Sequence, residues 1–172
     1  RTVLEERLAK MLAANPTLND FQERFDKIVA EYNEEKDKNT IEATFEALMR
    51  LTAEIEAEAQ AHVALGLTPD QKPIFDLLIQ EDLTKEEIRQ IKSASVELLK
   101  AIQRKIEEVQ DIFQKQSTRD GLRQEIYDLL YDERTGLPAT SYDDDALDTK
   151  TDALFQFFEN RYASSSHQAA FV

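Results

Sequence analysis

Two arginines four positions apart are the residues of this sequence whose type and spacing best suit binding chemistry. Arg119 and Arg123 fall in a stretch with helical periodicity. Side chains at positions i and i+4 share one face of a helix, so the two guanidinium groups would present forked donors to a phosphate or a carboxylate. We name them as candidate contacts to DNA or a partner, and we prefer ordinary ion pairs with the neighbouring Asp120, Glu125 and Asp128.

Residue patterns for nucleotide hydrolysis and zinc or di-iron chemistry are missing from the sequence. Its three glycines, at positions 66, 121 and 136, form neither a phosphate loop nor a dinucleotide-binding pattern. Its two histidines belong to no HExxH or ExxH arrangement. We interpret His62 as a partly packed structural residue and His167 as part of a tail.

Acidic clusters favour helix capping over catalysis. The run Asp143 to Asp145 lacks the glycine and glutamate that an EF-hand calcium loop requires, whereas negative charge is favourable at a helix N-terminus. Acid/base catalysis needs two carboxyl groups with separated pKa values in one pocket, and nothing in the sequence selects such a pair. We therefore expect no catalytic, cofactor-binding or metal-binding residue in this chain.

The charge balance is strongly acidic. The 172 residues carry 35 Asp and Glu against 21 Lys and Arg, a net charge of -14. The electric field of such a negative charge repels nucleic acid and anionic lipid. Acidic and basic residues are interleaved along the chain, which favours a role of the acidity in solubility over mimicry of DNA. Cysteine is absent and no apolar run approaches membrane-spanning length, so we expect a cytoplasmic protein that does not contact a membrane.

Composition and periodicity predict an all-α fold. With 3 Gly, 4 Pro and 41% hydrophobic residues, the chain suits helices and can form a core. The organising element is a helix predicted from Thr84 to about Gln116, with Thr84 and Glu87 as a capping box. A second long helix is predicted over residues 41–65, closed by Gly66, with one apolar face made of Ile41, Phe45, Leu48, Leu51, Ile55, Ala59 and Val63. This face should pack antiparallel against the first helix, and the small residues Ala57, Ala59 and Ala61 should allow close approach.

Shorter amphipathic segments complete an irregular antiparallel bundle. The bundle has about six or seven helices in all, and the two long ones are central. A polar run over residues 33–39 predicts a loop, and Thr68 and Pro69 predict a helix start. We assign residues 1–163 to one helical domain and residues 164–172 to a disordered tail. The shorter helices are expected around residues 3–12, 21–32, 74–82, 118–130 and 147–162.

Several packing and capping segments carry a resemblance as a set. They are Glu23-Arg24-Phe25 with Ile28, Tyr32 and Asn33; Gly66-Leu67-Thr68 with Phe75 to Leu78; Leu83 to Ile88; Arg119 with Leu122, Arg123, Ile126 and Leu130; and Leu137-Pro138 with Tyr142 and Phe155 to Tyr162. Together they resemble the C-terminal helical region of the motor (R) subunit of type I restriction-modification enzymes. The resemblance covers most of the chain and includes no catalytic signature.

The resemblance implies a role in assembly rather than a reaction. In that family the nuclease and the ATP-driven DNA translocase domains lie earlier in the polypeptide, and the C-terminal region helps to dock the motor onto the methyltransferase core. It implies partners in the methyltransferase (M) and specificity (S) subunits, DNA in the assembled enzyme, and ATP and Mg in the parent chain only. Since the first residue is Arg1, we expect a piece of a longer polypeptide, the parent being a type I site-specific deoxyribonuclease.

Two other functions stay open at this point. A self-standing acidic helical regulator, or a DNA mimic, could occupy a nucleic-acid-binding protein. The other is an enzyme whose active site is formed by carboxylates inside a helical bundle. The length of the native reading frame upstream of Arg1 would separate a motor subunit from a small regulator.

Overall fold

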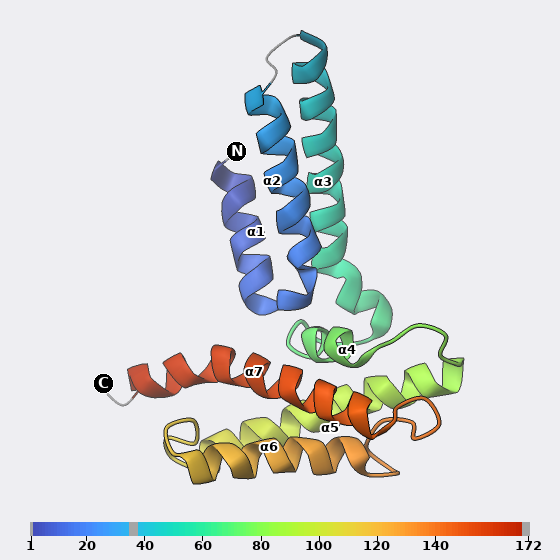
Figure 1. Ribbon diagram of the computed structural model, residues 1–172, viewed down its shortest axis with the longest axis vertical. Helices are drawn as coiled ribbons and strands as arrows, with labels where there is room; N and C mark the ends of the chain where they lie inside the picture. Colours follow the sequence, from blue (N-terminus) through green and yellow to red (C-terminus); the bar gives the residue numbers. More distant parts are fainter. Residues whose placement is uncertain (1, 35–37, 170–172) are drawn as a thin grey trace. The chain divides into compact units, whose positions relative to one another are not determined.

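A computed structural model describes the backbone of residues 2–34 and 38–169, and the side chains of 3–34 and 40–163. The described residues form seven α-helices, one 3-10 helix and no strand, which confirms the predicted all-α fold (Figure 1). The chain divides into two compact units, Arg1–Thr68 and Pro69–Val172. No helix in the described ranges combines the length and the apolarity needed to cross a membrane.

The first unit is a helical hairpin with a third helix packed on it. Helices α2 and α3 lie side by side, and α1 packs against both (Figure 1). The core contains Leu8, Phe25, Leu51 and Ile55, all at most 4% exposed. The elements are α1 (Thr2–Ala14), a 3-10 turn η1 (Pro16–Leu18), α2 (Asn19–Glu34) and α3 (Lys38–Leu65). The loop predicted over residues 33–39 falls mostly on 35–37, which lie outside the described residues.

Helix α3 ends at Leu65, and Gly66 follows it as predicted. The φ angle of Gly66, +72°, lies in the left-handed region, which glycine adopts without a steric penalty. The Leu67 amide then donates to the carbonyl of His62 at 3.0 Å, and the Gly66 amide donates to the carbonyl of Val63 at 3.1 Å. These two bonds satisfy carbonyl groups that a helix end otherwise leaves without partners.

The second unit contains four helices. Helices α5, α6 and α7 run side by side with successive helices antiparallel, and α4 packs against α5 and α7 (Figure 1). Thr84 and Glu87 form the predicted capping box at the start of α5, and the Asp143 carboxylate caps α7 by accepting from the Ala146 amide at 2.8 Å. The helices are α4 (Lys72–Leu78), α5 (Lys85–Glu108), α6 (Gln116–Tyr131) and α7 (Asp144–Ala169).

The two long helices fall in different compact units. Helix α3 belongs to the first unit and packs against α2 and α1, whereas α5 belongs to the second and packs against α4 and α6. The pairing of α3 with α5 therefore stays a prediction, and Ala57 and Ala59, which were expected to bring the two helices close, are exposed. Periodicity shows that a helix has an apolar face, but it does not identify the helix that covers it.

Helix α5 is shorter than predicted. It ends at Glu108 rather than near Gln116, and Asp111 has a left-handed φ of 54° in the turn that follows. This turn buries Ile112 and Phe113, and the Phe113 ring meets Phe155 of α7 edge-on at 6.1 Å between centroids. Tertiary packing therefore ends a helix that intrinsic propensity alone would continue.

The start of a further helix differs from the prediction. Helix α4 begins at Lys72 rather than at Pro69, because Pro73 has no amide to donate to the carbonyl of residue 69. The backbone of helix α7 is described as far as Ala169. Of the tail predicted over residues 164–172, residues 170–172 lie outside the described residues.

The loop between α6 and α7 is tied to α4 and α5 by polar contacts. The Tyr142 hydroxyl donates to the carbonyl of Leu78 at 2.5 Å, and the Gln90 amide donates to the carbonyl of Gly136 at 3.0 Å. A Cβ atom at Gly136 would overlap the backbone carbonyls of Leu130 and Asp132. The tight turn at the end of α6 therefore requires glycine.

Gly136→Ala should destabilise the chain, whereas Gly121→Ala should stabilise it. The added methyl group at 136 meets backbone atoms, but at 121 it meets nothing within 4 Å and removes a helix-interior glycine. We expect Gly121→Ala to add about 0.5–1 kcal/mol to the free energy of unfolding. Urea denaturation monitored by circular dichroism measures both changes, and an unchanged midpoint for Gly136→Ala would contradict the close approach.

Candidate functional site

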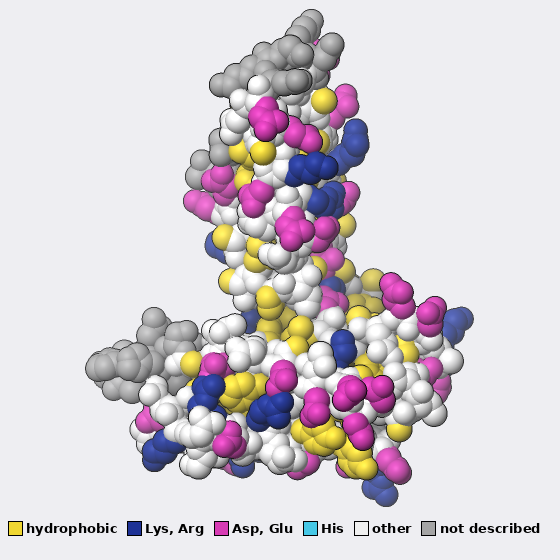
Figure 2. Space-filling view, in the orientation of Figure 1, with side chains coloured by type: hydrophobic (Ala, Val, Ile, Leu, Met, Phe, Trp, Pro, Cys, Tyr) yellow, Lys and Arg dark blue, Asp and Glu magenta, His cyan; other side chains and the backbone are white. Residues whose placement is uncertain are grey.

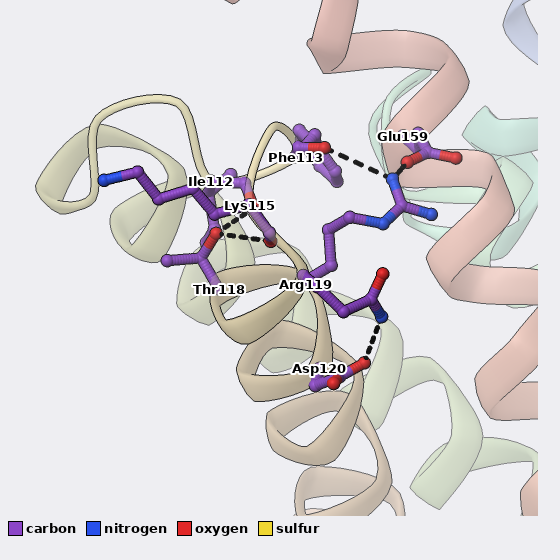
Figure 3. A network of polar contacts seen from close by, with 8 residues as sticks. Ile112, Phe113, Lys115, Thr118, Arg119, Asp120 and Glu159 are labelled. Carbon is purple, nitrogen blue, oxygen red and sulfur yellow. Dashed lines mark hydrogen bonds and ion pairs between the residues drawn. The ribbon is translucent and has the colours of Figure 1, made fainter.

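Arg119 is held in a network between α6 and α7. Its guanidinium group forms an ion pair with Glu159 of α7 and donates to the carbonyl of Phe113 at 3.3 Å (Figure 3). It also lies over the Phe155 ring, 5.1 Å from the centroid. The side chains of Arg119 and Glu159 are only 29% and 21% exposed. The arginine therefore neutralises a carboxylate, satisfies a turn carbonyl and covers an aromatic ring of the core.

Thr118 closes the same turn. Its hydroxyl donates to the carbonyl of Ile112 at 2.6 Å and to that of Lys115 at 3.0 Å (Figure 3). These bonds fix the start of α6 against the turn that follows α5. The first turn of α6 is thus arranged so that Arg119 reaches α7.

Arg123 makes a parallel but more exposed contact. Its Nε donates to the Asp152 carboxylate of α7 at 2.9 Å, and its Nη2 bonds to the same oxygen. The two side chains are 41% and 61% exposed. The predicted ion pairs at Arg119 and Arg123 are thus present, but their partners come from α7 rather than from neighbours on α6.

The two arginines bring α6 and α7 together and do not form a free cationic fork. A phosphate group would have to displace Glu159 and Asp152 from them. Contact with DNA or a partner through Arg119 and Arg123 stays a prediction, and structural pairing is the role that their geometry favours.

Arg119→Ala should therefore destabilise the second unit more than Arg123→Ala. We expect a loss of about 1–3 kcal/mol for the half-buried Arg119, which gives up a charged hydrogen bond and a cation–π contact. We expect about 0–1 kcal/mol for the more exposed Arg123. Urea unfolding of the two variants compares them directly, and equal losses would show that burial does not separate the two pairs.

Acidic neighbours also affect Tyr127, one turn after Arg123. Partial burial raises the pKa of its hydroxyl, and the carboxylates of Asp144 and Asp148 add to the rise. The Tyr127 ring stacks on Tyr131 with 6.1 Å between centroids. At neutral pH this tyrosine is a neutral packing residue beside the start of α7.

A second candidate region is an apolar groove in the first unit. The groove has a volume of about 670 Å³ and lies between α1 and α3 over α2. It is lined by Leu4 of α1, by Ile28 and Val29 of α2, and by Leu48 and Thr52 of α3. The Arg7 side chain also lines the groove, and it forms an ion pair between α1 and α3 with Glu56 at 3.0 Å.

Large apolar side chains at this groove are open to solvent. Phe45 and Met49 of α3 are 65% and 58% exposed, and Val3 of α1 is 67% exposed. Tyr32 of α2, at 38%, completes the set. Soluble proteins seldom gather exposed apolar residues on one surface without a binding role.

This exposure corrects the predicted core face of α3. Ile41, Phe45 and Val63 were expected to be buried, but they are 45%, 65% and 64% exposed. Leu51 and Ile55 form the face that is buried against α1 and α2. Phe45 and Met49 are functional candidates that the sequence reasoning missed. The available signal was the width of the apolar stripe on α3, because the stripe is wider than the surface that one neighbouring helix can cover.

An ion pair on the other side of the hairpin fixes α2 on α3. The Arg24 guanidinium donates to the Glu54 carboxylate at 2.5 Å. This hydrogen bond raises the pKa of Arg24 and lowers the pKa of Glu54, so both groups stay charged at neutral pH. Arg24 also lies over the Phe21 ring at 5.6 Å, which extends the contact to the edge of the core.

Buried polar side chains in the described residues serve the helices themselves. The Ser95 hydroxyl donates to the carbonyl of Ile91 at 2.8 Å, and the Thr151 hydroxyl donates to that of Leu147 at 2.7 Å. The Lys72 ammonium pairs with Asp76 at 2.6 Å. Among the described residues, no three histidine, aspartate or glutamate side chains are grouped so that they could hold a metal ion. His62 lies in the last turn of α3, and the side chain of His167 lies outside the described residues.

A protein-family model matches nearly the whole chain. Residues 1–163 match the family described as type I restriction enzyme HindI endonuclease subunit-like, C-terminal. No curated protein and no solved structure matched the chain. The family match covers both compact units and ends inside α7.

Proposed function

We propose an assembly role for this chain, which belongs to the family of C-terminal regions of HindI-like type I restriction enzyme endonuclease subunits. In this proposal it is a non-catalytic helical domain that docks the endonuclease subunit onto the methyltransferase core. Its partners are the methyltransferase and specificity subunits, with DNA present in the assembled enzyme. ATP and Mg serve the parent chain and have no binding residues assigned here.

The observation that carries this proposal is the open apolar groove of the first unit. Restriction enzymes of this type are built from several subunits, so a C-terminal region needs a surface that another subunit can cover. Phe45 and Met49 are more than half exposed, and covering a fully exposed side chain of this kind contributes about 1.5–3 kcal/mol. A groove lined by such residues is suited to binding a protein.

The chemistry of the polar groups supports the same role. Ser95 and Thr151 bond to carbonyls one turn earlier on their own helices, and Arg119 bonds to a turn and to a neighbouring helix. Groups used in this way stabilise packing and are not aimed at a substrate. We therefore assign DNA cleavage and translocation to other parts of the parent subunit.

The alternative of an acidic regulator or DNA mimic has less support. Such a surface needs carboxylates free of cations, but Glu54, Glu56 and Asp152 are paired with arginines. Side chains of both charges are interleaved on the face shown in Figure 2. Local neutralisation of this kind weakens the resemblance to a phosphate backbone.

Deletion of residues 1–163 from the endonuclease subunit should abolish its assembly with the methyltransferase core. Because we assign nucleotide binding to the rest of the subunit, the truncated protein should still bind ATP. Gel filtration of each subunit with the methyltransferase core measures assembly, and fluorescent ATP binding shows that the truncated subunit is folded.

The isolated chain provides the matched control. Added in excess, it should compete with the full endonuclease subunit for the methyltransferase core and lower co-elution. Co-elution of the truncated subunit at full-length affinity would mean that docking occurs elsewhere in the parent chain.

A further inference from the structure

We propose that the groove between α1 and α3 binds an amphipathic helix of the partner subunit, with basic residues along the edge that faces α3. The inference rests on the proposed assembly function and adds the class of segment that docks. The incoming helix would lie over α2 and complete the three-helix unit as a bundle of four.

The shape of the first unit supports a helical occupant. Residues of α1 and α3 line the groove together with Ile28 and Val29 of α2. Phe45 and Met49 are four positions apart on α3, so they form a row parallel to the helix axis. An incoming helix with apolar residues at positions i, i+4 and i+7 would place them along this row.

The charges on α3 determine the character of the incoming helix. Glu42 and Glu46 are each three positions before Phe45 and Met49, so these carboxylates lie beside the apolar row on the helix surface. Both residues are exposed, and the Glu46 side chain makes a loose ion pair with Arg50 at 3.7 Å. Lys or Arg along one edge of the partner helix would complement this border.

The opposite wall has mixed charge. Arg7 of α1 lines the groove but is already paired with Glu56 of α3, and the exposed Glu6 lies four positions before Lys10. A basic edge of the partner helix is therefore favoured against α3, where Glu42 and Glu46 lie beside the apolar row. A second copy of this chain is a poorer occupant, because two copies with a net charge of -14 each would repel one another.

Binding of two designed peptides to the whole chain tests the groove directly. Both peptides are helices of about five turns with one leucine stripe, and they differ only in Lys or Glu along one edge of that stripe. Fluorescence anisotropy should give at least about tenfold tighter binding of the Lys-edged peptide. Glu42→Lys combined with Glu46→Lys should reverse this preference.

Two substitutions separate specific docking from general attraction to an acidic protein. Phe45→Glu and Met49→Glu should each weaken binding of the Lys-edged peptide about tenfold or more. Val63→Glu is the matched control, because Val63 is equally exposed on α3 but does not line the groove. Equal binding to all three variants, or dimers of the free chain that Phe45→Glu disrupts, would overturn the inference.

Assembly with the methyltransferase core separates this inference from the proposed function. Endonuclease subunits carrying Phe45→Glu or Met49→Glu should fail to co-elute with the core, while Val63→Glu should co-elute normally. If the Phe45 and Met49 variants assemble normally, the proposed assembly function is retained and the inference about the groove fails. If the unaltered subunit does not bind the core, the assembly function fails, and the peptide experiment still decides what the groove binds.

Discussion

Burial of helical apolar faces is the constraint on which the rest of this structure depends. In the second unit α5, α6 and α7 cover one another, and Leu98, Ile102, Leu122, Ile126 and Phe158 are almost completely buried. In the first unit α3 has more apolar surface than α1 and α2 cover. Leu51 and Ile55 are buried, while Phe45 and Met49 on the adjoining row stay exposed. The difference between a closed and an open apolar face is the basis of the functional proposal.

Ion pairs in the chain fix the positions of helices that the apolar faces bring together. Arg24 joins α2 to α3, Arg7 joins α1 to α3, and Arg119 and Arg123 join α6 to α7. Each arginine neutralises a carboxylate of another helix, which limits self-repulsion in a chain of net charge -14. Structural pairing is therefore the role that the geometry favours for Arg119 and Arg123.

Local signals in the sequence predicted much of the fold, and long-range packing accounts for most of the errors. The capping box at Thr84, the glycine at 66 and the aspartate cap at 143 depend on residues close in sequence, and all three are confirmed. The end of α5 depends on the packing of Phe113 against Phe155, which is distant in sequence, and it was predicted wrongly. Phe45 was read as core for the same reason, since periodicity shows an apolar face but not its covering helix.

Footprinting of Met49 tests most directly whether the open groove is the docking surface. The chain has two methionines, and Met49 lines the groove while Met11 packs against the core of the same unit. Hydroxyl radicals oxidise exposed methionine side chains. Because Met11 does not line the groove, the oxidation rate of its side chain serves as an internal control. The account predicts that assembly with the methyltransferase core slows oxidation of Met49 and leaves that of Met11 unchanged. An unchanged Met49 oxidation rate in the assembled complex would contradict it.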